Sequence, residues 1–114
     1  MGTAAVTNMS STLERELWTS FVSVLRSYLA AHTLNRSEQA ILEVSATSLL
    51  VRVGPRTLKV EHTGNEGAWQ RETGSPIPFR FDEHGRIITG GHTPENPQEM
   101  DIVAEQLARE ITTP

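Results

Sequence analysis

The sequence predicts one α+β domain, made of a long N-terminal helix, an antiparallel meander sheet of four to five strands and a C-terminal helix. Apolar residues recur every three or four positions up to about residue 34, alternate from residue 40 onward, and return to helical spacing after residue 96. The connections between the alternating segments are short, which favours antiparallel pairing because parallel strands need crossovers of a dozen residues or more. Two helices can cover only one face of such a sheet, so we expect both on the same face.

The first helix is expected to run from about Thr12 to Leu34, with Asn35 ending it in a left-handed conformation. Its apolar residues share one stripe, as a helix that faces a core requires. The stripe contains Leu13, Leu17, Trp18, Phe21, Val22, Leu25, Tyr28 and Leu29. Residues 1–10 are expected to form a disordered tail, which leaves residues 11–114 as a single domain.

Alternation of apolar and polar residues predicts the strands of the sheet. The expected strands are Ala40–Ala46, Leu49–Val53, Thr57–Thr63, Ile77–Asp82 and Arg86–Thr89. The segment from Gly64 to Pro76 holds three glycines and a proline and is expected to form a long loop. The alternative for this segment is a further short strand over Ala68–Arg71.

The pleat of a strand divides its residues between two faces of the sheet. The face expected beneath the helices carries Leu42, Val44, Val51, Val53, Leu58, Val60, Phe79 and Phe81. The opposite, uncovered face carries Glu43, Ser45, Leu50, Arg52, Thr57, Lys59, Glu61, Arg80 and Asp82.

The last helix is expected to follow a Gly- and Pro-rich connection, Thr89 to Asn96. Asn96 is the expected N-cap, and Pro97 suits the first helical position because its missing N–H has no partner there anyway. We expect this helix to reach about Ile111.

Composition excludes several classes of site and partner. The chain has 114 residues and no cysteine, so disulfides, thiolate nucleophiles and cysteine-ligated metals are excluded. The net charge is −4 and there is no basic stripe, so no nucleic-acid partner is expected. No apolar run is long enough for a membrane span, and residues 1–10 lack a secretory pattern, so a cytoplasmic protein with no membrane partner is expected.

The uncovered sheet face is the first candidate binding surface. On it Arg52, Lys59 and Arg80 would contact anions, and Leu50 would be an apolar anchor. The alternative is a solvated face laced with cross-strand ion pairs, such as Glu43 with Arg52. In the predicted loop, Trp69 is either an exposed interface anchor or a ring that folds back over the edge of the sheet.

A second class of function, a small enzyme or a metal-binding protein, would use histidines and acids. Candidate residues are His62, Asp82, His84 and His92, which are ligand types for zinc and similar ions. The simpler interpretation of His62 is a strand-end histidine whose ring borders the core. No nucleophile elbow or phosphate-binding motif is present, and no metal or cofactor is predicted.

The order of a first helix, a meander and a last helix resembles the frataxin-like arrangement in outline. That family carries an acidic ridge for iron, whereas the first helix here has only Glu14 and Glu16 as acids, so no function is carried over. The sequence favours a non-enzymatic binding or assembly module that acts through the uncovered sheet face or a sheet edge. Its expected partner is another protein or a second copy of the chain.

Overall fold

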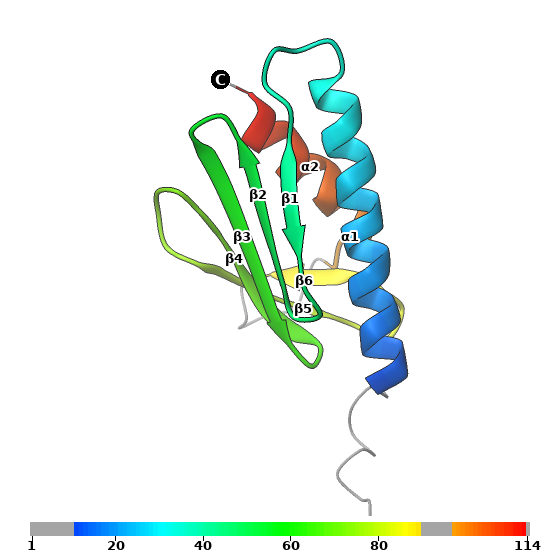
Figure 1. Ribbon diagram of the computed structural model, residues 1–114. Helices are drawn as coiled ribbons and strands as arrows, with labels where there is room; N and C mark the ends of the chain where they lie inside the picture. Colours follow the sequence, from blue (N-terminus) through cyan, green and yellow to red (C-terminus); the bar gives the residue numbers. More distant parts are fainter. Residues whose placement is uncertain (1–10, 90–96, 114) are drawn as a thin grey trace, which may run out of the picture.

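The chain forms one helix, a sheet and a second helix, as predicted (Figure 1). The structure, a computed structural model, describes residues 11–89 and 97–113. Within these residues the elements are α1 (Ser11–Thr33), β1 (Ile41–Val44), β2 (Ser48–Val53), β3 (Arg56–Thr63), β4 (Glu66–Arg71), β5 (Ile77–Phe81), β6 (Ile87–Thr89) and α2 (Met100–Thr112). Each strand pairs antiparallel with the next, so the sheet order is β1-β2-β3-β4-β5-β6. The predicted tail, the predicted N-cap Asn96 and His92 lie outside the described residues.

Helix α1 agrees with its sequence pattern at its C-terminal end. It ends at Thr33, and Asn35 has a φ of 66°, the left-handed conformation expected of it. The most deeply buried side chains of its stripe are Trp18, Phe21, Val22, Leu25 and Leu29. Leu17 and Tyr28, at the flanks of the stripe, are only partly buried and pack against the core.

Both helices cover the same face of the sheet, and one continuous core fills the space between them. Figure 1 shows α1 and α2 on that side, with α1 running beside β1 in the opposite direction to the strand. The sheet contributes most of the predicted inward residues, and α2 adds an apolar stripe. These buried residues are Leu49, Val51, Val53, Leu58, Val60, Phe79, Phe81, Val103, Ala104, Leu107, Ala108 and Ile111.

The predicted long loop is wrong, because six of its thirteen residues form strand β4, and the alternative short strand over Ala68–Arg71 lies within that strand. Trp69 pairs with Val60 of β3 on one side and with Ile77 of β5 on the other. A two-residue turn makes this possible: Gly64 has a φ of 62°, which suits the first position of a tight hairpin turn. Gly64 therefore serves a turn and Gly67 a strand, whereas Gly74 stays in a short loop. Within the described residues the sheet has six strands rather than four or five.

Strand β1 departs from the predicted burial. Leu42 is only half-buried, and Val44, which was expected in the core, is 43% exposed. β1 is the edge of the sheet, so no further strand covers its outer side. The end of β1 also borders a groove beside α1, which is described below.

Helix α2 starts later than predicted and ends under a cluster of arginines. Gln98 pairs with Ile87 through two backbone hydrogen bonds, of 2.8 and 2.9 Å, so the chain is still extended there and the helix begins at Met100. At the other end, guanidinium groups donate to the last carbonyl oxygens of α2, which no helical N–H can reach. The donors are Arg36 to Thr112, Arg56 to Ile111 and Arg71 to Glu110. Positive charge at this end also complements the helix dipole.

Candidate functional site

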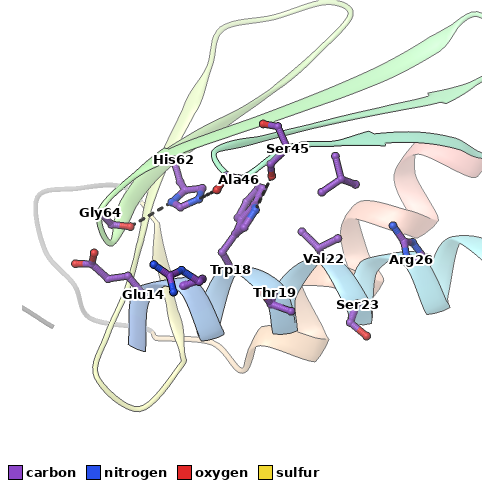
Figure 2. Close-up of a pocket in the computed structure, with 12 residues that line it drawn as sticks. Glu14, Trp18, Thr19, Val22, Ser23, Arg26, Ser45, Ala46, His62 and Gly64 are labelled. Atoms are coloured by element: carbon purple, nitrogen blue, oxygen red, sulfur yellow. Dashed lines mark hydrogen bonds between the residues drawn. The ribbon is translucent and has the colours of Figure 1, made fainter. Parts of the chain in front are cut away.

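A groove of about 420 Å³ lies between α1 and the end of the β1–β2 hairpin (Figure 2). One wall is a single face of α1, because residues at spacings of three and four lie above one another on a helix. That wall includes Arg15, Trp18, Thr19, Val22, Ser23 and Arg26. Val44, Ser45, Ala46, His62 and Gly64 form the other wall. Three other cavities, of about 250, 250 and 390 Å³, are smaller.

Trp18 and His62 hold the two walls together. The indole of Trp18 is buried, and its Nε1 donates a hydrogen bond to the Ser45 carbonyl oxygen at 3.2 Å. The centroids of the Trp18 and His62 rings are 4.3 Å apart. His62 Nε2 lies 2.9 Å from the Ala46 carbonyl oxygen, and Nδ1 lies 3.2 Å from that of Gly64. A neutral imidazole carries one N–H and donates to only one of them. The predicted position of His62, at the border of the core, is confirmed.

The backbone of β1 offers unpaired groups next to this groove. Ser45 N donates to Ser48 O at 2.8 Å, which fixes the alternation of hydrogen-bonded and non-hydrogen-bonded pairs along the β1–β2 ladder. By that alternation the N–H and C=O groups of Leu42 and Val44 face away from β2. The described residues supply no hydrogen-bond partner to these groups. Four backbone groups on one edge are therefore open to an added strand.

The opposite edge of the sheet is less open. The backbone of Ile87 in β6 exchanges two hydrogen bonds with Gln98, so part of that edge is already paired. Since edge strands are the natural sites for pairing with another chain, the two edges differ in what they offer. The β1 edge is the accessible one among the described residues.

Two arginines on the α1 wall have no ion-pair partner among the described residues, Arg15 and Arg26. Most other arginines are engaged: Arg52, Arg71 and Arg86, for example, form ion pairs. Figure 2 shows Arg26 at one end of the groove and Glu14 at the other. Glu14 is the one acidic side chain among the lining residues. The Arg26 end is therefore positive. Near the other end, the negative charge of Glu14 offsets the positive charge of Arg15.

The predicted residues of the uncovered face lie where the alternation put them. Arg52 forms an ion pair with Glu43 at 2.9 Å, and Lys59 forms one with Glu61 at 3.4 Å. Leu50 is half-buried between them, opposite Glu43 and Lys59 in the pairing register. Two of the three residues expected to contact anions, Arg52 and Lys59, are thus already paired with neighbouring acids. This is the arrangement expected of a solvent-exposed face with ion pairs, the alternative to a binding surface.

Arg80 lies apart from this group, towards the β6 side of the face. It is half-buried, faces Glu66 and Ile88 in register, and lines a hollow of about 250 Å³ with them. The structure therefore does not bring Arg80 together with Arg52 and Lys59.

Trp69 is not an exposed anchor. It is 8% exposed, and its ring stacks on Phe79 with centroids 5.1 Å apart on the helix-covered face. Pairing of β4 on both sides places its side chain inside, so little of the residue is left exposed to a partner.

The histidines and acids of the second hypothesis do not converge. Among the described side chains, no three His, Asp or Glu come together in a way that could hold a metal ion. His62 is in the groove, whereas Asp82 and His84 are in the β5–β6 turn. His84 is exposed.

Asp82 uses its carboxylate to close that turn. It accepts hydrogen bonds from the backbone N–H groups of His84 and Arg86, each at 2.9 Å, and from the Arg86 guanidinium at 3.0 Å. Partial burial raises the pKa of Asp82, but these hydrogen bonds and the charge of Arg86 outweigh it, so the pKa lies below its usual value.

Sequence reasoning named His62 as a candidate but missed the polar residues of the groove on α1. Arg15, Thr19, Ser23 and Arg26 follow one another at helical spacing along the polar flank of the α1 stripe. That pattern is visible in the sequence, but it is also typical of any solvated helix face. Only the placement of Val44 opposite this flank makes it one wall of a groove.

Comparison of the chain with protein families, curated proteins and solved structures found no match. The resemblance to the frataxin-like arrangement therefore extends only to element order. No helix in residues 11–89 and 97–113 is both long and apolar enough to cross a bilayer.

Proposed function

We propose that this protein is a non-enzymatic binding module that takes an extended segment of another protein as an additional strand at the β1 edge. The observation that carries the proposal is the set of unpaired Leu42 and Val44 backbone groups beside the α1–β1 groove. In strand addition, main-chain hydrogen bonds give affinity and pockets for alternate side chains give specificity. The edge would supply the first and the groove the second.

The apolar surface around this edge supports the proposal. Ile41 is 57% exposed and Val44 is 43% exposed, on opposite faces of the same short strand. An added strand would cover part of both side chains and extend a sheet that is already antiparallel throughout. Trp18 is buried and donates a hydrogen bond to Ser45, and these contacts fix the position of the groove wall before a partner binds.

A partner segment suits this edge better than a second copy of the chain. When two β1 strands pair in the centred antiparallel register, with Leu42 of each copy facing Val44 of the other, the two copies of Glu43 lie directly opposite one another. Like charges in that position are destabilising. Registers that avoid the clash shorten the overlap of a strand that has only four residues.

The test is to select peptides that bind the full chain from a random displayed library and to measure their affinity for two variants at one position. Val44→Pro removes the outward N–H but no β1–β2 hydrogen bond, and Val44→Thr is the matched control that keeps both N–H and shape. We expect the proline variant to bind at least about tenfold more weakly, because it loses one hydrogen bond and the fit of the added strand. The threonine variant should bind nearly as the wild type does.

Two further measurements make the outcome independent of the folding of the proline variant. Urea unfolding shows whether Val44→Pro is folded, and NMR titration of the wild-type chain shows which amides shift. Shifts centred on Leu42 and Val44 support the proposal. Peptides that shift Leu50 and Arg52 instead, or concentration-dependent dimerisation that Val44→Pro abolishes, would assign the binding to the uncovered face or to a second copy.

A further inference from the structure

We infer that the segment bound at the β1 edge carries an apolar residue followed, two positions later, by an acidic residue. This inference rests on the proposed function and specifies the chemistry of its partner. It comes from the match between the spacing of side chains on a strand and the spacing of residues on the α1 wall.

The direction of the segment follows from the fold. Every pair in the sheet is antiparallel, so an added strand is expected to run antiparallel to β1. Because α1 runs opposite to β1, as Figure 1 shows, that strand runs in the same direction as α1. Moving along it towards its C-terminus means moving from Val22 towards Arg26.

The register of the segment follows from Leu42 and Val44, the two β1 residues whose backbone N–H and C=O groups face away from β2. A residue paired with Val44 points its side chain to the same side of the sheet as Val44, which is the groove side. There it meets Val44 and Val22, so an apolar side chain is favoured. The residue two positions later pairs with Leu42 and points to the same side.

The distances along the two elements agree. Side chains two residues apart on a strand are separated by about 6.8 Å, and four residues of helix rise about 6 Å. The second side chain therefore lies beside Arg26, four residues after Val22. Arg26 is exposed and has no ion-pair partner among the described residues, so a carboxylate there gains a partner without displacing another acid.

The opposite end of the groove gives no comparable preference. Arg15 and Glu14 both line it, and a carboxylate placed there would meet both charges. His62 adds no free donor, because its ring nitrogens already face the Ala46 and Gly64 carbonyl oxygens. The acid is therefore expected only on the C-terminal side of the apolar residue.

The experiment compares two blocked, threonine-rich peptides by NMR titration of the full chain. Each has one valine, followed two residues later by glutamate in the first peptide and by glutamine in the second. We expect the glutamate peptide to bind about two- to fivefold more tightly, the range for an exposed ion pair, with a smaller difference at high salt. Both should shift the Leu42 and Val44 amides.

Two arginine variants make the assignment specific. Arg26→Gln should weaken the glutamate peptide by the same factor and leave the glutamine peptide unchanged. Arg80→Gln, on β5 and without an ion pair among the described residues, is the matched control and should change neither. Equal binding of the two peptides to the wild-type chain, or an effect of Arg80→Gln as large as that of Arg26→Gln, would overturn the inference.

The failure of this inference differs from the failure of the proposed function. If both peptides shift the Leu42 and Val44 amides with equal affinity, the edge binds strands without selecting an acid. If neither these peptides nor the library peptides shift those amides, the proposed function itself is wrong.

Discussion

Replacement of Trp69 by alanine separates the burial seen in the structure from the exposed anchor that the sequence also allowed. The ring is 8% exposed and stacks on Phe79, which in turn contacts Phe21 and Phe81 with centroids 6.5 and 5.5 Å away. Truncating a buried aromatic residue to alanine costs about 3–5 kcal/mol, whereas surface substitutions usually stay within about 0.5 kcal/mol. We expect Trp69→Ala to lower the free energy of unfolding by about 4 kcal/mol.

The assay is equilibrium unfolding in urea, followed by far-ultraviolet circular dichroism because the variant loses a tryptophan. With a slope of about 2 kcal/mol per molar urea, the midpoint should fall by about 2 M. A domain with about 5–15 kcal/mol of stability would still fold, unless it lies at the low end of that range. Trp69→Phe is the conservative control, since it keeps a ring against Phe79 and should recover most of the loss. A Trp69→Ala midpoint equal to that of the wild type would refute the burial of this residue.

Two other predictions concern β4 and the β5–β6 turn. Gly67→Ala should destabilise the fold by about 1–3 kcal/mol in the same urea assay, because the new Cβ would lie 2.8 Å from Phe79 Cζ and closer still to the Glu61 carbonyl oxygen. A neutral or stabilising effect would show that β4 can shift away from these atoms. The lowered pKa of Asp82 means that its carboxylate contributes stability that is fully present above the unfolded-state pKa of about 3.9 and is lost as the pH falls through the folded-state pKa. Asp82→Asn should therefore lose less stability than the wild type when urea midpoints are compared between neutral pH and about pH 3, and equal losses would contradict this role.

Periodicity made much of the fold predictable. Helical spacing up to Leu29 and alternation from Leu42 onward are local properties, and they determine which side of each element is apolar. Asn35 could be recognised as a helix end because few other residues tolerate the left-handed conformation. The short turns then left antiparallel pairing as the simple connection between strands. These features suffice for the element order, for the common face of the two helices and for the residues of the uncovered face.

Sequence alone therefore establishes the type of every regular element except β4 and the apolar side of most of them, because both depend on neighbours within a few positions. Tertiary structure decided the rest. Strand β4 was hidden because Gly67 interrupts its alternation, and only pairing with β3 and β5 on both sides places Trp69 inside. The groove likewise exists only because Val44 at the sheet edge lies across from Arg26 and its neighbours on α1, and nothing local links residues that are so far apart along the chain.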